Sequence, residues 1–320
     1  MQATQAQAPV RNKWLARFCA VDVSFCLRVG AAFAAIYLIW GSTYLAIRFA
    51  IDSLPPFFMA GVRFLIAGSL LYAWTRLQGV SRPARLHWRE AGVIGGLMLL
   101  GGNGGVTWAE QRVSSGLAAL MIATVPLWMV LLEAVRPGGT RPTGRTGLGV
   151  ALGLAGMALL IGPWRLGGGP GVDMLGAGVL LLAALAWTVG SLYSRQARLP
   201  AAPLQATGME MLAGGLWLMV AAGLTGEWDR LDLASVTPRS WLALGYLVIF
   251  GSLLAFTAYV WLLRVSTPAR ASTYAFVNPV VAVGLGWALA GEPLSARTLL
   301  AAAVIVAAVA LITTGRSPAR

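Results

Sequence analysis

Aromatic side chains recur at helical spacing in the most apolar parts of this 320-residue sequence. Trp40, Tyr44 and Arg48 follow one another at intervals of four residues, so they share one face of a helix. Trp187 and Arg195 repeat the outer two at the same interval of eight. Aromatic rings offer apolar and cation–π surface, which suits the binding of a small organic solute. The alternative is an aromatic belt at a membrane interface, which fits Arg48 better than Trp40 and Tyr44.

Two amide side chains lie in similarly apolar surroundings. Asn103 stands between two pairs of glycines, and Asn278 lies four residues after Tyr274. An amide without a partner is costly in lipid, so both side chains must face protein or water. Asn103 therefore either bonds a neighbouring helix or lines a cavity at a break in its own helix.

These patterns together predict one substrate-binding cavity near the middle of a membrane. The residues that we expect to line it are Trp40, Tyr44, Asn103, Trp108, Trp187, Phe256, Tyr259, Tyr274 and Asn278. Pro126 and Pro279 lie at matching places in two apolar segments and should kink both helices. Paired kinks of this kind mark the moving or substrate-facing parts of a transporter.

Two charged side chains lie inside apolar segments. Arg63 and Glu210 are separated by 147 residues, the same offset that separates Trp40 from Trp187. At 1.5 Å per residue each lies about 10 Å deep in a hydrocarbon core of ~30 Å. Either each side chain reaches its own interface or bonds a neighbouring carbonyl, or the two residues serve coupling, with Glu210 binding a proton or a cationic group of the substrate.

The residues that most enzymes and metal sites use are scarce. The only lysine is Lys13, the only histidine is His87, and the only cysteines are Cys19 and Cys26. A Walker A motif needs a lysine, and a zinc site needs clustered histidines or cysteines. The few carboxylates form no close pair suited to hydrolysis. We therefore expect no enzyme activity, no cofactor and no metal site.

The elements that position these residues are membrane helices. Hydrophobic residues make up 58% of the chain and charged residues 11%, too few charges to cover a soluble domain. An open sheet cannot satisfy its backbone in lipid, so we predict an all-α integral membrane protein with ten transmembrane helices. They are placed at about 28–50, 57–75, 90–109, 116–134, 146–162, 174–195, 204–224, 241–263, 270–290 and 297–314.

The chain contains two copies of one unit, since Arg112-Val-Ser114 returns as Arg264-Val-Ser266. We expect a first five-helix repeat at 28–165 and a second at 170–315, between cytoplasmic tails at 1–27 and 316–320. Five spans per unit would insert the second copy upside down. Inverted repeats of this kind are typical of alternating-access transporters.

The net charge of +13 indicates orientation in the membrane and does not point to nucleic acid. Seventeen of the 24 arginines and lysines fall on the side of the N-terminus, six on the other side, and Arg63 within a span. By the positive-inside rule both termini are cytoplasmic. The expected partners are the lipid bilayer and a small-molecule substrate.

The fifth and tenth predicted helices are rich in glycine and alanine and have no polar residue at mid-span. Small residues allow close helix packing, either within one chain or between two copies, which leaves a homodimer open. We expect these two helices to form scaffold.

Three motifs stand out: Trp40-Gly-Ser-Thr-Tyr44, Arg63-Phe-Leu-Ile-Ala-Gly68, and Asn278-Pro279 followed by Gly291-Glu-Pro-Leu294. Together they resemble the EamA-type branch of the drug/metabolite transporter (DMT) superfamily, over residues 32–314. The resemblance implies ten helices in two inverted repeats, a central cavity and no ATP site. It also implies export of amino acids, related metabolites or toxic small molecules across the bacterial inner membrane. The second half has Glu292-Pro293 where the first has Arg141-Pro142, and we expect Glu292 to cap the last helix.

These observations predict a multi-pass protein of the bacterial inner membrane, with both termini cytoplasmic. It would be a secondary transporter that exports amino acids, related metabolites or drug-like compounds by alternating access. An importer of the same architecture and a non-transporting membrane protein are the alternatives.

Overall fold

The computed structural model describes residues 23–135, 143–161, 173–266 and 274–314. Within these ranges the chain is helical and contains no β-strand. The first helix begins at Val23, before the predicted start at residue 28. The rest of the predicted N-terminal tail, the C-terminal tail at 316–320 and the Arg141-Pro142 motif lie outside the described residues.

The first half contains five helical rods among the described residues. They are α2 (Val23–Ala50), α3 (Pro56–Leu77), the joined helices α4 (Arg85–Ile94), η1 (Gly95–Gly104) and α5 (Gly105–Ala109), the pair α6 (Ser115–Ile122) and α7 (Val125–Val135), and α8 (Gly144–Ile161).

The described part of the second half repeats this order. Its rods are α9 (Met174–Ser194), α10 (Pro203–Leu224), the joined helices α11 (Pro238–Tyr246), η3 (Leu247–Phe256) and α12 (Thr257–Val265), then α14 (Tyr274–Ala290) and α15 (Ala296–Thr314). The ten predicted helices are thus present as ten rods.

Six described helices are long and apolar enough to cross a membrane: 24–50, 56–77, 115–135, 174–194, 203–224 and 238–262. Two shorter apolar helices cover 277–290 and 296–312. The remaining two predicted spans correspond to the α4–η1–α5 rod and to α8. The molecule is therefore a helical membrane protein.

Each half contains a π-helical segment at the same place in its third rod. η1 and η3 are both ten residues long, and both continue into α-helix at each end. A π-helix has a wider turn than an α-helix and occurs often at functional sites. In η1, glycines allow the neighbouring rods to approach closely. A methyl group on Gly95 would lie 2.5 Å from the backbone nitrogen of Gly214 in α10, and one on Gly101 would lie 2.9 Å from Cβ of Ala186 in α9.

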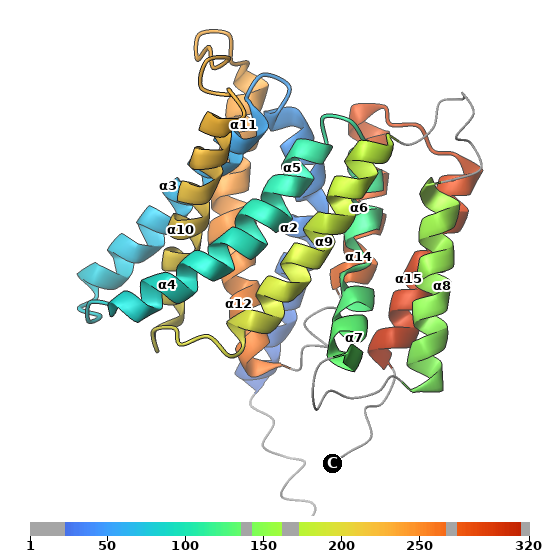
Figure 1. Cartoon of the computed structure of the whole chain (residues 1–320), viewed down its shortest axis with the longest axis horizontal. Coiled ribbons are helices and arrows are strands. Elements are labelled where there is room, and N and C mark those ends of the chain that lie inside the picture. The colour runs from blue at the N-terminus through green and yellow to red at the C-terminus, as the bar shows by residue number, and fades with distance from the viewer. Residues whose placement is uncertain (1–22, 136–142, 162–172, 267–273, 315–320) are drawn as a thin grey trace, which may run out of the picture.

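Counterpart helices of the two halves pack against each other. α3 lies against α10 and α8 against α15, at opposite sides of the bundle (Figure 1). Between them α14 packs against α2, and α9 packs against α6 and α7. Exchanging the two halves maps the contact of α2 with α14 onto the contact of α9 with α6 and α7, and maps the other two contacts onto themselves.

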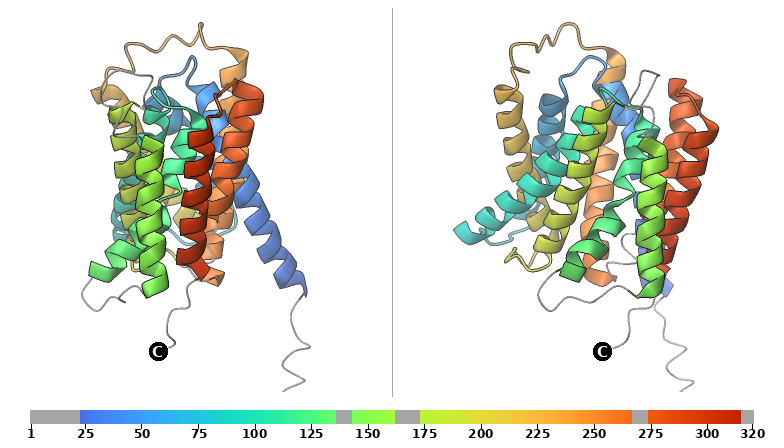
Figure 2. Two further views of the ribbon diagram at one scale, coloured as in Figure 1. Left: turned by 90° about the vertical axis from the view of Figure 1, so that its right-hand side faces the viewer. Right: turned by 45° about the vertical axis from the view of Figure 1, so that its right-hand side comes forward.

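The described chain begins and ends at the same end of the bundle. Figure 2 shows the first turn of α2 and the last turn of α15 at this end, which we call the terminal end. The loop after α9 also lies there (Figure 1), whereas the loop between α2 and α3 lies at the opposite end.

Glycines on α8 face α15 within the same chain. A methyl group on Gly149 would lie 2.8 Å from Cγ1 of Ile312 and 2.9 Å from the carbonyl oxygen of Ala308. Gly156 meets Ile305 at a similar distance of 2.8 Å. Of the two expected uses of these small residues, the described contacts show packing inside one chain.

We predict that Gly149→Ala destabilises the protein by about 1–3 kcal/mol, because the added methyl group meets backbone that cannot move aside cheaply. Gly147→Ala is the matched control on the same helix, since nothing lies within 4 Å of its added methyl group. The measurement is thermal unfolding of both variants in detergent. Equal melting temperatures for the two variants would contradict the packing described for α8 and α15.

Candidate functional site

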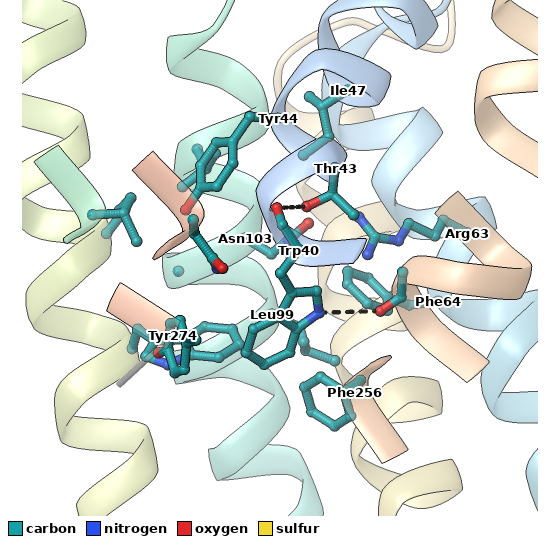
Figure 3. Close-up of a pocket in the computed structure, with 17 residues that line it drawn as sticks. Trp40, Thr43, Tyr44, Ile47, Arg63, Phe64, Leu99, Asn103, Phe256 and Tyr274 are labelled. Atoms are coloured by element: carbon teal, nitrogen blue, oxygen red, sulfur yellow. Dashed lines mark hydrogen bonds between the residues drawn. The ribbon is translucent and has the colours of Figure 1, made fainter. Parts of the chain in front are cut away.

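A cavity lies between the two halves of the chain, with an empty volume of about 640 Å³ that includes space open to solvent. Its wall comes from α2, α3, η1, α5 and α6 in the first half, and from α9, η3 and α14 in the second. Figure 3 shows their side chains around one space. The predicted residues that line it are Trp40, Tyr44, Arg63, Asn103, Trp187, Phe256, Tyr274 and Asn278.

Trp40 stands at the centre of an aromatic cluster that joins the halves. Its ring centroid lies 4.9 Å from that of Tyr259, 5.1 Å from that of Tyr274 and 5.9 Å from that of Trp187. Such pairs contribute about 0.5–1.5 kcal/mol each beyond simple burial. The indole N–H of Trp40 also donates to the carbonyl oxygen of Gly251 in η3, at 3.3 Å (Figure 3). Trp40 is thereby held by partners from three rods of the second half.

The two predicted amides are used differently. With its amide nitrogen facing the backbone, Asn278 donates to the carbonyl oxygens of Tyr274 at 3.2 Å and Tyr37 at 3.1 Å, so it links α14 to α2. The side-chain oxygen of Asn103 is buried and has no hydrogen-bond partner. Asn103 thus lines the cavity from an unbroken rod, and the expected helix break is absent from the described residues 85–109.

Arg63 and Glu210 line different spaces, although both are buried. The Nε of Arg63 donates to the hydroxyl of Ser252 at 2.8 Å beside the central cavity. Glu210 lines a hollow near the terminal end, together with Arg195 and Tyr259. The charges at equivalent positions in the two halves therefore face different spaces.

Two predicted residues lie away from the central cavity. Trp108 lines a separate hollow at the opposite end, where the guanidinium carbon of Arg112 lies 5.1 Å from the centre of its ring. Tyr259 lines the hollow near the terminal end, although its ring contacts Trp40 and Tyr274. The structure does not bring Trp108 together with the other aromatic residues.

The two prolines affect their helices differently. α6 ends at Ile122, and α7 resumes with Pro126 as its second residue, so this rod is interrupted. α14 continues through Pro279 as one helix. Proline frees the carbonyl four residues before it, which for Pro126 is that of Ile122, a residue of the cavity wall. The rod is therefore interrupted near Pro126, whereas α14 continues through Pro279, where the kink stays a prediction.

Sequence spacing did not identify every residue of the wall. Thr43 and Ile47 line the cavity three and seven residues after Trp40, and Phe64 follows Arg63. The helical spacing around Trp40 was a signal for Thr43 and Ile47. The apolar Phe64 carried no such signal, because its neighbours are equally apolar.

A model of the EamA-like transporter family matches the chain twice, at residues 29–162 and 174–314. The chain belongs to this family. One relative is the uncharacterized inner membrane transporter YedA of Escherichia coli K12, which is 45% identical over 288 residues and 90% of each chain. A chloroplastic WAT1-related protein of Arabidopsis thaliana is 28% identical, over 86% of this chain and 67% of its own length. The uncharacterized transporter YoaV of Bacillus subtilis is 22% identical, over 87% of this chain and 94% of its own length. A solved structure with 24% identity shares the fold, with a TM-score of 0.64 over 89% of this chain and 96% of that one.

In this EamA-like transporter two loop carboxylates cap helices of the other half. Glu292 accepts hydrogen bonds from the N–H and the hydroxyl of Ser115, both at 2.8 Å, at the start of α6. Glu227 accepts from the N–H groups of Phe57 at 3.3 Å and Phe58 at 2.8 Å, at the start of α3. The expected cap of Glu292 on the last helix is therefore wrong. Its carboxylate satisfies the unpaired N–H groups of a helix in the first half.

Glu110 is a buried carboxyl group that the sequence did not reveal. It follows α5 at the opposite end, is fully buried, and neither of its carboxyl oxygens has a hydrogen-bond partner. Its backbone carbonyl accepts a hydrogen bond from Arg48 at 2.6 Å. Burial and the nearby charge of Glu292 raise the pKa of Glu110 well above its ordinary value, and the charge of Arg48 opposes them. Nothing in the polar residues that follow Glu110 indicates this burial.

We predict that the EamA-like transporter loses stability as pH rises, and that Glu110→Gln weakens this loss. The unfolded chain releases the Glu110 proton near its ordinary pKa, whereas the folded chain holds it to higher pH, so rising pH favours unfolding between the two values. The measurement is melting temperature in detergent from about pH 5 to pH 8. Asp229→Asn, in an exposed loop, is the control. The same slope in the wild type and Glu110→Gln would contradict the prediction.

Proposed function

We propose that this chain is a secondary transporter of a bacterial inner membrane that exports small organic solutes by alternating access. The observation that carries the proposal is the central cavity, because its wall is built from helices of both halves. Movement of one half against the other would change the access to such a cavity from each side of the membrane.

The arrangement of the two halves supports inverted repeats. Each half contributes five rods in the same order among the described residues, and two counterpart pairs, α3 with α10 and α8 with α15, pack together. If every rod spans the membrane, five crossings per half give the second half the opposite orientation in the membrane to the first. The family model matches each half separately, which supports a duplicated unit.

Charge supports a cytoplasmic terminal end. Arg76 lies in the last turn of α3, Arg85 and Arg89 lie in the first half of α4, and Arg195 and Arg198 follow α9, all toward that end. Cytoplasmic loops carry an excess of arginine and lysine. The name of the relative YedA, an inner membrane transporter, supports the same location.

The aromatic cluster suits a gate on the cytoplasmic side. Tyr259 lines the hollow near the terminal end, while its ring partners Trp40, Trp187 and Tyr274 line the central cavity. The cluster therefore stands between the two spaces. Separation of these four rings would join the cavity to the cytoplasmic hollow.

The aromatic wall favours amino acids, related metabolites or drug-like compounds as solutes. Export is the proposed direction because of the resemblance to metabolite exporters. Import by the same architecture is the second candidate, since a symmetric cycle does not fix the direction of flux. A non-transporting membrane protein is the third, and it predicts solute binding without movement.

We predict that Trp187→Ala lowers solute counterflow about tenfold or more. Truncation of a buried aromatic anchor costs roughly 2 kcal/mol or more, and about 1.4 kcal/mol is tenfold in binding. Trp287→Ala removes the same side chain from an exposed position on α14 and should leave counterflow unchanged. The measurement is counterflow in proteoliposomes with a panel of radiolabelled amino acids. Equal loss in both variants would contradict the cavity as the binding site, and no counterflow in folded wild type would contradict transport.

A coupling role for Glu210 has a separate test. If Glu210 binds a coupling proton, Glu210→Gln should abolish the pH dependence of net transport while counterflow continues. Glu133→Gln changes a partly exposed carboxylate at the end of α7 and is the control. Unchanged pH dependence in Glu210→Gln would eliminate this role.

A further inference from the structure

Arg63 is the one charged side chain in the wall of the central cavity, among the residues that the structure describes. It is 3% exposed and lies within α3. Figure 3 shows its guanidinium reaching from α3 toward Thr43 and the cavity. The side chain thus points into the protein and does not extend to a membrane interface.

Two contacts fix the orientation of the Arg63 guanidinium. Its Nε donates to the hydroxyl of Ser252 at 2.8 Å, and its central carbon lies 4.7 Å from the centre of the Phe64 ring. These two contacts hold the plane of the group. They leave the terminal nitrogens for another partner.

Arg63 lacks an anionic partner among the described residues. Its Nη1 is buried without a hydrogen-bond partner, and the ion pair found in the described ranges is Arg112 with Asp173, which is partly exposed. A guanidinium does not deprotonate in proteins, and a buried charge is costly unless it is paired. The wall of the cavity therefore contains an uncompensated positive charge.

A second polar atom in the same wall is also buried and unpaired. The side-chain oxygen of Asn103 is a hydrogen-bond acceptor without a donor. The cavity thus offers one cationic donor at Arg63 and one neutral acceptor at Asn103, among aromatic rings that include Trp40, Trp187 and Phe256. A complementary solute has a carboxylate, a hydrogen-bond donor such as an ammonium group, and an apolar body.

We propose that Arg63 binds the carboxylate of the transported solute, with Asn103 accepting a hydrogen bond from a donor on the same solute. This inference rests on the proposed transport function and names its substrate class. A guanidinium matches a carboxylate through two parallel hydrogen bonds. A single carboxylate neutralises a single guanidinium, whereas a phosphate monoester would add a second, uncompensated negative charge. Solutes that are only cationic would be repelled by Arg63.

The test uses three probes with their matched derivatives. L-phenylalanine, L-tryptophan and L-leucine each have a methyl ester, which lacks the carboxylate, and a deaminated acid, which lacks the ammonium group. Binding is measured as the shift in melting temperature of purified protein, and transport as counterflow in proteoliposomes. The wild type should respond to the amino acids, more weakly to the deaminated acids, and about tenfold or more weakly to the esters.

Arg63→Gln should weaken the response to the carboxylate-bearing probes at least about tenfold and leave the response to the esters unchanged. Arg63→Lys retains the charge without the planar fork and should restore part of the response. Asn103→Ala should weaken the amino acids but not the deaminated acids. Without solute, Arg63→Gln should melt no lower than the wild type, because it removes an unpaired charge.

Three results would overturn the proposal. One is equal binding of carboxylates by Arg63→Gln and wild type. Another is equal binding of amino acids and their esters by the wild type. The third is no response to any probe in either assay. If binding follows the expected pattern but folded wild type moves no probe, carboxylate recognition stands and transport fails. If esters and acids are transported equally, transport stands and the role of Arg63 fails.

Discussion

The structure depends on one constraint: a polar group inside a bilayer must find its partner within the protein. The indole N–H of Trp40 donates to a backbone carbonyl in η3. The amide nitrogen of Asn278 donates to one backbone carbonyl in α14 and one in α2. Both contacts join the first half to the second. The same constraint makes the unpaired atoms of Arg63 and Asn103 informative, because a buried polar atom without a partner is costly. The indole nitrogen of Trp187, in the same wall, is also unpaired.

The helix starts follow the same constraint at the membrane surface. Glu227 and Glu292 belong to loops of the second half, yet each carboxylate accepts N–H groups at the start of a first-half helix. A carboxylate at a helix N-terminus also interacts favourably with the helix dipole. These contacts cross the boundary between the halves. Any movement of one half against the other would have to break or carry along these two caps.

The sequence predicted the fold because its signals are long and local. Ten apolar stretches, a repeated Trp and Arg offset and a composition of 58% hydrophobic residues all indicate one architecture. Trp40 and Tyr44 were placed correctly on one helix face because α2 is regular throughout. Trp108 was misplaced because it lies in α5, at the end of its rod, where it lines the hollow at the opposite end. Glu110 and the partner of Glu292 depend on contacts between distant segments, which spacing along one helix does not show.

The two halves share a fold but differ in charge, and this difference distinguishes the two spaces along the proposed path. Arg63 and Glu210 occupy equivalent positions, yet one faces the central cavity and the other faces the hollow near the terminal end. If inverted halves exchange conformations during transport, as proposed, each position takes the surroundings of its counterpart. The carboxylate site would then be next to Arg63 in one state, and Glu210 would approach the cavity in the other. A substrate anion would be attracted in the first state and repelled in the second, so the second state would favour its release.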